Sequence, residues 1–591
     1  MFLFNSCKLL NSTVRRIVQG PKYFNGPIMG SSCSRSFSPN SGQPKNRNGA
    51  VTSVEPNSEY VEEVVCKVND INENEMKVFD IGEDGKVLVV KQKGEINALG
   101  TKCTHYGAPL SQGALGDGRI RCQWHGACFN LKTGDIEDFP GFDSLPCYQV
   151  TITKKGEVKV RAKKSDLKTN KRTKELVEVT ELEDTSVVIV GGGPSGGTCA
   201  ETLRSEGFKG RITLICKEKY LPYDRVKVSK VSQIPEVSKL EARTDDYYSK
   251  AKIDVLKNNE VTKVNTEENY VQCKDGTKVP YKYLYLASGT KARVPDVPGV
   301  GMKNIFTVRD YDDSVSIFTA LGDQKDKNVV VLGFGFIGLE IASTCVAKAE
   351  SMTVVGKDTA PLANIFGTSV GQNIQKLFED NGIKFVFETT IVKCDGENGY
   401  IKSVELANGA VLPADILVLG VGTTYYTDYL KGSGVDMRPD GSIEVNEMLE
   451  TNVKNVYAGG DIAYAPVFAL NNAKSTIGHI GLAQYHGLNV AKTIAGKGSP
   501  IRAVPFFWTM LFGKSIRYAG CGRPVSSQIV GDVSELKFVI FFFDEAEKVI
   551  AVASCMRDPI VSQFAELLSQ GKSLHKKDLA EDPFVWTKWI N

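Results

Sequence analysis

The chain has 591 residues, of which 42% are hydrophobic and 24% charged, as expected for a globular protein of several domains. Its net charge is only +3, so composition gives no reason to expect nucleic-acid binding, and no apolar run is long enough for a membrane span. The 14 cysteines are scattered singly, which excludes a small disulfide scaffold and favours a reducing compartment.

Residues 1–54 form a basic segment without a single acid. Its apolar start, MFLFNSCKLL, and its serines and asparagines resemble a mitochondrial presequence, with a disordered basic tail as the alternative. Met29 begins MGSSCS, which from an internal start would match an N-myristoylation signal, with Cys33 open to palmitoylation. We therefore expect a mitochondrial protein, with a cytoplasmic or membrane-associated one as the alternative.

Residues 60–162 consist of short alternating strands with glycine turns, which predicts a small all-β domain. In its middle, Cys103 and His105 form Cys-x-His, and sixteen residues later Cys122 and His125 form Cys-x-x-His. Zinc accepts the same ligands, but zinc fingers usually pair Cys with Cys and His with His. One Cys and one His on each loop suit a two-iron cluster, in which one iron takes the thiolates and the other the imidazoles. The spacing resembles the Rieske family, so these four residues are the predicted ligands of a [2Fe–2S] cluster.

The loops depart from the respiratory Rieske proteins, which carry a disulfide and two hydroxyl donors to the cluster. At the matching positions this chain has Ala108, Trp124, Ala127 and Phe129. Because those hydrogen bonds stabilise the reduced cluster, their loss predicts a low potential.

After a polar linker at 163–184, apolar strands alternate with helical segments, the pattern of a parallel sheet. VVIVGGGPSGG places Gly191, Gly193 and Gly196 between a strand and a helix, as in a dinucleotide-binding fold. Glu218 follows at the distance expected for a carboxylate that binds the adenosine ribose.

VVVLGFGFIGLEIA repeats this pattern with Gly333, Gly335 and Gly338, so two dinucleotides are expected, FAD and NADH or NADPH. Further on, Gly460 and Asp461 resemble the second flavin motif of two-dinucleotide reductases, whose Asp binds the ribityl chain. This order predicts a nicotinamide domain inserted into the flavin domain. The predicted bounds are 185–308 and 427–499 for the FAD-binding domain, and 309–426 for the NAD(P)-binding domain.

The second strand of the nicotinamide unit ends SMTVVGKD, with Asp358 two residues later than the acid that commonly holds the NADH ribose. Lys357 could favour the 2′-phosphate of NADPH or could be a solvated loop lysine, so the donor stays open. The segment LPYDRVKVSK, 221–230, lacks the cysteine pair of disulfide reductases. Flavin electrons must therefore leave by another route, and the Rieske centre is the nearest candidate.

Residues 500–591 return to strands, including the apolar run FVIFFF, before a last helix near 560–570. We expect a C-terminal α+β domain here. The whole chain is thus predicted to join an all-β Rieske domain to an α/β reductase with two dinucleotide sites.

LPYDRVKVSK, GFGFIGLE, AGGD and VPFFWTMLFGKSIRYAGCG together resemble the apoptosis-inducing-factor family of flavoproteins of the pyridine nucleotide-disulfide oxidoreductase type. With the Rieske domain, residues 60–591 are similar to its Rieske-containing type. The resemblance implies that Arg225 and Lys230 reach the flavin and that Lys230 pairs with Glu340; an ordinary domain-interface salt bridge is the alternative. It also implies that His479 and Trp508 line the flavin pocket, rather than only packing in the core. It puts NADH slightly ahead as the donor.

The resulting prediction is an NAD(P)H-dependent FAD oxidoreductase that passes electrons from flavin to its own Rieske cluster and on to an unknown acceptor, which could be a protein. The alternative is a redox sensor that promotes apoptosis through a protein interaction. The sequence leaves the oligomeric state open.

Overall fold

The computed structural model describes residues 59–231 and 233–590. The basic segment 1–54, with the presequence and lipidation signals suggested for it, lies outside these residues. Within the described part, no helix is both long and apolar enough to cross a membrane.

The N-terminal domain is built from two antiparallel sheets. The larger has the order β1 (Tyr60–Lys67), β10 (Glu157–Lys163), β9 (Cys147–Ile152), β4 (Glu95–Leu99), β3 (Gly85–Gln92) and β2 (Glu75–Ile81). The smaller is inserted between β4 and β9 and comprises β5 (Ala114–Gly116), β6 (Arg119–Arg121), β7 (Cys128–Asn130) and β8 (Ile136–Asp138). The predicted all-β architecture is confirmed, and the two Cys/His loops flank the first two strands of the smaller sheet. A short helix, α1 (Lys164–Thr169), follows.

Two parallel five-stranded sheets form the reductase core. The first has the order β13 (Ile253–Leu256), β12 (Gly210–Ile215), β11 (Glu183–Val190), β17 (Tyr283–Leu286) and β29 (Val456–Ala458). The second has the order β19 (Ile305–Phe306), β26 (Ile416–Leu419), β20 (Asn328–Leu332), β21 (Ser351–Val355) and β22 (Ile383–Val386). Because β29 comes after the whole second sheet in the chain, the second unit is inserted into the first.

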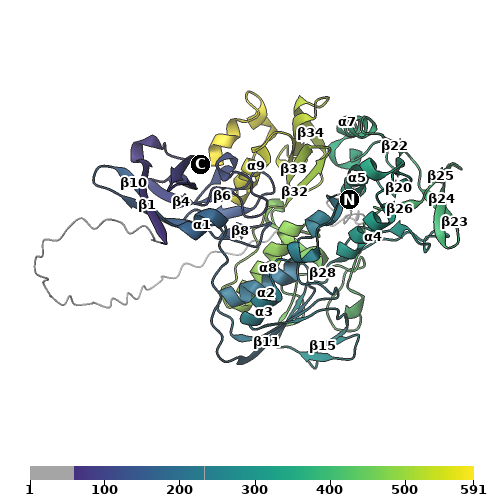
Figure 1. The fold of residues 1–591 in the computed structure, drawn as a ribbon, viewed down its shortest axis with the longest axis horizontal. Coiled ribbons are helices and arrows are strands. Elements are labelled where there is room, and N and C mark those ends of the chain that lie inside the picture. Colours follow the sequence, from purple (N-terminus) through teal and green to yellow (C-terminus); the bar gives the residue numbers. More distant parts are fainter. Residues whose placement is uncertain (1–58, 232, 591) are drawn as a thin grey trace, which may run out of the picture. The chain divides into compact units, whose positions relative to one another are not determined.

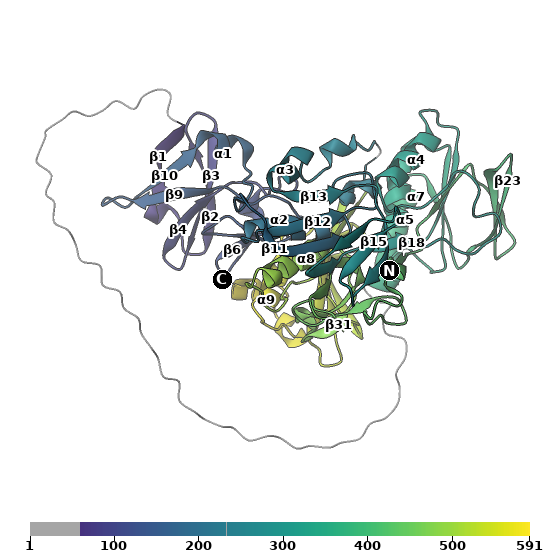
Figure 2. The ribbon, with the colours of Figure 1, turned by 90° about the horizontal axis from the view of Figure 1, so that it is seen from below.

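Helices and small sheets complete the two units. The first unit has α2 (Pro194–Ser205), α3 (Asp245–Lys250), α8 (Ile480–Ile494) and the strands β14 (Val261–Asn265), β15 (Tyr270–Cys273), β16 (Lys278–Pro280), β28 (Ile443–Glu444), β30 (Ala463–Val467) and β31 (Ala473–Ser475). The second has α4 (Tyr311–Leu321), α5 (Phe336–Cys345), α6 (Ala363–Phe366), α7 (Thr368–Glu379) and β23 (Ile391–Glu397), β24 (Tyr400–Leu406) and β25 (Val411–Pro413). β18 (Thr290–Ala292) pairs with β27 (Thr423–Tyr425) where the units meet. In Figures 1 and 2, α2 and α8 lie side by side in the first unit.

The C-terminal domain is an antiparallel sheet with one long helix. The strand order is β32 (Phe506–Leu511), β33 (Lys514–Gly520), β36 (Val549–Cys555), β35 (Lys537–Phe543) and β34 (Ser526–Asp532), and the helix is α9 (Ile560–Ser569). Alternate residues of β35 pack on opposite sides: Phe538 joins the nicotinamide-unit core, whereas Phe541 joins a core with α9. The apolar run FVIFFF is therefore a strand buried on both faces, as its sequence predicted.

The same helix also contacts the Rieske domain. Ala114 of β5 belongs to the hydrophobic core that α9 forms with the C-terminal sheet, and Figure 1 shows α9 between β33 and the Rieske strands. One face of the C-terminal sheet therefore packs on the nicotinamide unit. The helix α9 packs on the smaller N-terminal sheet, β5–β8, which we call the cluster-binding sheet because the two Cys/His loops flank its first strands.

Candidate redox site

The two Cys/His loops fold in the same way. The backbone N–H of Gly107 donates to the Cys103 carbonyl at 2.9 Å, and that of Gly126 donates to the Cys122 carbonyl at 3.2 Å. Both glycines have a left-handed backbone, with φ of +79° and +81°, which favours glycine there. The equivalent turns bring both thiols and both imidazoles to the same place.

The four side chains meet as two like pairs. The Nδ1 atoms of His105 and His125 lie 3.0 Å apart, and each of the Cys103 and Cys122 thiols is the largest influence on the pKa of the other, raising that of Cys103 and lowering that of Cys122. Within the described residues, no three His, Cys, Asp or Glu side chains surround one point as a single metal ion would need. A thiol pair facing an imidazole pair is the division that a two-iron cluster requires.

The surroundings of these groups suit metal ligation. Burial lowers the pKa of His105 to about 4 and that of His125 to about 2, so both imidazoles are neutral at pH 7, the form that binds a metal. The backbone N–H of Trp124 donates to the Cys122 sulfur at 3.4 Å, which orients that ligand.

The first glycine-rich turn has the shape of a pyrophosphate cradle. A Cβ on Gly191 would lie 2.3 Å from the Ala287 carbonyl oxygen, and one on Gly196 would lie 2.0 Å from the Gly191 oxygen. Gly193, the residue that precedes α2, has nothing within 4 Å of such a Cβ. The two tight glycines hold the strand against the helix, and the open one leaves room for phosphate at the helix N-terminus.

The second turn repeats the arrangement. A Cβ on Gly333 would lie 2.4 Å from the Gly420 oxygen and one on Gly338 would lie 2.3 Å from the Gly333 oxygen, whereas Gly335 faces open space before α5. The chain therefore holds two cradles that each fit a dinucleotide.

A cavity of about 530 Å³ extends from the first cradle and includes Glu218, Arg225 and Asp461 in its wall. Glu218 forms an ion pair with Arg225. Asp461 accepts hydrogen bonds from Thr290 Oγ1 at 3.1 Å and from Arg309 Nη2 at 3.0 Å. These polar groups fit the ribose, ribityl and phosphate groups of FAD.

The backbone of Gly460, the residue before Asp461, is positioned by a buried histidine. Its N–H donates to Nδ1 of His486 at 3.2 Å, and burial lowers the pKa of His486 to about 4. The imidazole is therefore neutral at pH 7 and able to accept this bond.

A smaller cavity of about 180 Å³ lies at the second cradle, with Gly335, Phe336 and His479 in its wall. Ala292 belongs to the walls of both cavities, so the two adjoin. A flavin in the first and a nicotinamide in the second would meet near this residue.

Glu340 joins three parts of the reductase. Its side chain is 2% exposed and forms an ion pair with Lys230. It also accepts hydrogen bonds from Ser229 Oγ at 2.5 Å and from Thr509 Oγ1 at 2.6 Å. The flavin unit, helix α5 and strand β32 therefore share one buried carboxylate.

Trp508 lies between the smaller cavity and the cluster loops. Its ring meets that of His479 edge-on at 4.8 Å between centroids, and that of His125 at 4.5 Å. On the other loop, Tyr106 stacks on His105 at 3.7 Å, and its hydroxyl donates to Asp224 at 2.5 Å. The predicted Rieske ligands are thus in contact with the reductase, and His479 and Trp508 link the smaller cavity to them.

The position after β21 that often carries the NADH-binding acid is a glycine for a steric reason. A Cβ on Gly356 would lie 2.5 Å from the ring of Phe334, the residue between the first two glycines of the cradle. Lys357 is exposed, and Asp358 accepts a hydrogen bond from Asn364 at 2.6 Å. The geometry leaves both NADH and NADPH open.

The sequence did not indicate several residues that take part in this site. Tyr106, Arg309 and Thr509 act through contacts more than a hundred residues away along the chain, and no local pattern marks them. Glu566 has a detectable signal, because it is an acid on the apolar face of the predicted last helix.

Comparison with known proteins identifies the same two kinds of domain. The pyridine nucleotide-disulphide oxidoreductase model matches residues 185–487, just over half of the chain, and the Rieske [2Fe-2S] domain model matches residues 62–149. Apoptosis-inducing factor 3 of Homo sapiens is 41% identical over 525 residues, which cover 88% of this chain and 86% of that protein.

Ferredoxin reductases match more than half of the chain. The ferredoxin–NAD(+) reductase subunit of the benzene 1,2-dioxygenase system of Pseudomonas putida is 29% identical over 56% of this chain and 80% of its own. The crystal structure of the ferredoxin reductase for the CYP199A2 system from Rhodopseudomonas palustris has a TM-score of 0.65 at 26% identity, covering 69% of this chain and 100% of that one. These matches confirm a flavoprotein oxidoreductase that uses FAD, a [2Fe–2S] cluster and NAD(P)H. The chain belongs to the pyridine nucleotide-disulphide oxidoreductase family, as a Rieske-containing member of its apoptosis-inducing-factor group.

Proposed function

We propose that this protein passes electrons from NAD(P)H, by way of its FAD, to its own Rieske cluster, and from there to an acceptor outside the chain. The observation that carries the proposal is the double contact of Trp508 with His479 and His125. One aromatic side chain therefore touches both a predicted cluster ligand and His479, in the wall of the smaller cavity, and that cavity adjoins the proposed flavin cavity at Ala292.

The bound cofactors supply the redox chemistry, hydride acceptance by flavin and single-electron carriage by the cluster. The contribution of the protein is positioning. Gly191, Gly193 and Gly196 hold the FAD pyrophosphate, with Glu218 and Asp461 on its sugar and ribityl groups. Gly333, Gly335 and Gly338 do the same for the nicotinamide dinucleotide.

Lys230 is the group that tunes the flavin in this proposal. Its ammonium is held by the buried carboxylate of Glu340, and a cation beside the ring system favours the anionic reduced form. Arg225, paired with Glu218, lies in the wall of the larger cavity.

The cluster is expected to have a low potential, which nicotinamide can drive. Cys122 Sγ receives the Trp124 N–H, whereas Ala127 and Phe129 stand where the respiratory proteins have hydroxyl donors. Fewer hydrogen bonds to sulfur make the reduced cluster less stable and lower its potential.

Anaerobic titration of the purified protein with NADH and then NADPH tests the proposal. We expect the flavin absorption to bleach and a Rieske EPR signal to appear after it, and the better donor identifies the nucleotide. The proposal fails if the flavin is reduced while the cluster stays EPR-silent and only dithionite brings up its signal.

The printed name of the human relative, apoptosis-inducing factor 3, supports a second candidate, a redox sensor whose output is a protein interaction that promotes apoptosis. Turnover separates the two, because a sensor is reduced once and reoxidises slowly, whereas a reductase cycles with an artificial acceptor. Mitochondrial localisation is proposed from residues 1–54 alone, and a fusion of these residues to a fluorescent protein tests it.

A further inference from the structure

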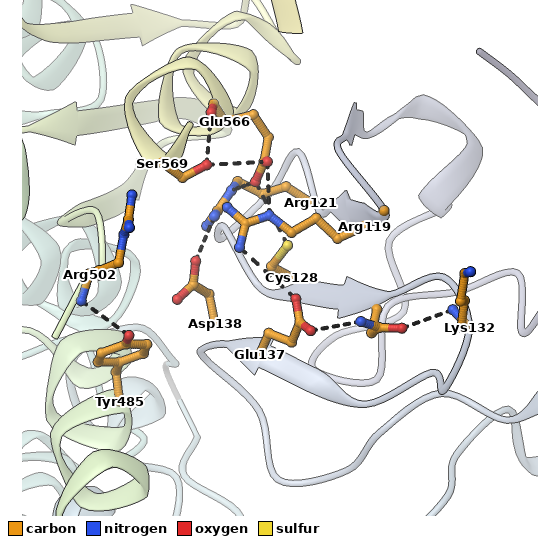
Figure 3. Close-up of polar contacts among 12 residues, drawn as sticks. Arg119, Arg121, Cys128, Lys132, Glu137, Asp138, Tyr485, Arg502, Glu566 and Ser569 are labelled. Atoms are coloured by element: carbon orange, nitrogen blue, oxygen red, sulfur yellow. Dashed lines mark hydrogen bonds and ion pairs between the residues drawn. The ribbon is translucent and has the colours of Figure 1, made fainter. Parts of the chain in front are cut away.

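The Rieske domain is attached to the reductase by a buried carboxylate from the C-terminal helix. Glu566 of α9 is fully buried and accepts hydrogen bonds from Arg121 Nε at 2.5 Å and Arg119 Nε at 3.0 Å. Figure 3 shows both arginines reaching from the cluster-binding sheet to this single side chain. Gly116 leaves room for the Glu566 carboxylate, because a Cβ on Gly116 would lie 2.1 Å from one of its oxygens.

The charges in this contact balance. Arg121 also donates to Asp138 at 2.6 Å, so the two buried carboxylates Glu566 and Asp138 face two guanidinium groups, with Glu137 farther out, 4.0 Å from Arg119. Burial alone would lower the pKa of Arg121, but Glu566 and Asp138 raise it well above its usual range. Without Glu566, a buried cation would lose its main partner, which is costly in a low-dielectric interior.

The contact reaches the cluster loop itself. Arg121 directly precedes the predicted ligand Cys122, and its Nη1 donates to the Gly126 carbonyl, next to His125, at 2.8 Å. One turn before Glu566 on α9, Ser562 Oγ donates to the Cys122 carbonyl at 3.0 Å. Helix α9 thus holds the start of the second ligand loop directly, through Ser562. It holds the end of the loop indirectly, through the bond of Glu566 to Arg121.

The opposite side of this loop rests on the strand that carries Trp508. A Cβ on Gly126 would lie 2.6 Å from the ring of Phe506 in β32, so the loop backbone sits directly on that ring. The loop is therefore held between α9 and β32, with His125 in contact with Trp508.

We propose that Glu566 is a positioning residue that, with Ser562, keeps the Rieske domain permanently docked, so that electrons reach the cluster without a domain movement. This inference rests on the proposed function. The step it governs moves one electron from the reduced flavin to the oxidised cluster, and no bond to the protein forms or breaks.

Stopped-flow and rapid-freeze EPR measurements on the anaerobic full-length protein mixed with NADH test this inference at several glycerol concentrations. The wild-type cluster should be reduced at a rate that does not depend on viscosity. In Glu566→Gln we expect cluster reduction at least about tenfold slower and viscosity-dependent, because loss of a buried charge partner undocks the domain. Flavin reduction and the EPR g-values should stay unchanged.

Two further variants keep the test decisive. Glu137→Gln removes an acid on the rim of the same contact, 4.0 Å from Arg119, and should behave as wild type. Ser562→Ala should slow cluster reduction in the same direction, and it decides the matter if Glu566→Gln loses its cluster or does not fold.

The outcomes separate the two proposals. A wild-type protein that reduces its flavin but not its cluster refutes the proposed function. A wild type that transfers electrons, with Glu566→Gln or, failing that, Ser562→Ala as fast and as insensitive to viscosity, refutes only the docking role. Shifted g-values at an unchanged transfer rate would also refute it, because Glu566 would then tune the cluster and not its position.

Discussion

Replacing Glu340 with glutamine separates the charge of the buried carboxylate from its shape. The carboxylate accepts from Lys230 and Thr509 on one oxygen and from Ser229 on the other. A glutamine oxygen can face Lys230 and Thr509, while its NH₂ group donates to the Ser229 hydroxyl. The variant therefore keeps the hydrogen-bond geometry and removes only the negative charge.

The three bonds set the expected size of the effect. A hydrogen bond to a charged group contributes about 1.5–3 kcal/mol, and a neutral one about 0.5–1.5 kcal/mol. Losing the charge should therefore cost about 1 kcal/mol at each bond and lower the unfolding free energy by about 3 kcal/mol. The share that falls on Lys230 alone, about 1 kcal/mol, corresponds to about fivefold in rate.

Stopped-flow reduction of the flavin by NADH, together with urea unfolding, tests this expectation. We expect Glu340→Gln to reduce its flavin about fivefold more slowly. Asp395→Asn, which removes an exposed ion pair with Lys393, should leave the rate unchanged. If Glu340→Gln is destabilised as expected but reduces its flavin at the wild-type rate, the pair with Lys230 is only a domain-interface salt bridge.

The remaining predictions concern three other places. His486 has a pKa of about 4 in the folded protein against 6.5 ordinarily, so the unfolded chain binds its proton more readily. The unfolding free energy should fall by up to about 3 kcal/mol as pH falls from 6.5 to 4, and His486→Asn should reduce this slope in urea unfolding at each pH. Gly126 has a left-handed backbone, and a Cβ there would meet the Phe506 ring. Gly126→Ala should therefore lose the cluster or separate it from the reductase. Iron content reports the first outcome, and NADH-driven EPR reports the second. Lys357→Ala should change the KM for NADH and NADPH by less than about twofold; a rise for NADPH alone would assign Lys357 to the 2′-phosphate.

The glycine cradles could be predicted because their constraints are local. The contacts that require Gly196 and Gly338 come from the same strand–turn–helix unit, so spacing along the chain is enough to identify them. The pattern of the predicted cluster ligands is equally local, since each loop carries one Cys and one His within four residues. Short motifs of this kind report the fold and the cofactors.

The docking of the domains could not be predicted in the same way. Arg121 and Glu566 are 445 residues apart, and neither lies in a motif. Arginine side chains are mostly exposed, and only the packing of α9 against the cluster-binding sheet shows that this one is buried. Tyr106 and Asp224 pose the same problem, because their bond joins domains on either side of a linker.

Strand β32 explains how one short segment serves both halves of the electron path. Successive strand residues point to opposite faces, so Trp508 points to the cluster side while Thr509 points to Glu340. The neighbouring residues follow the same alternation, with Phe506 under the ligand loop and Leu511 in the nicotinamide-unit core. A shift of this strand would therefore disturb the Lys230–Glu340 pair and the contact with His125 together, because the backbone that carries both is the same.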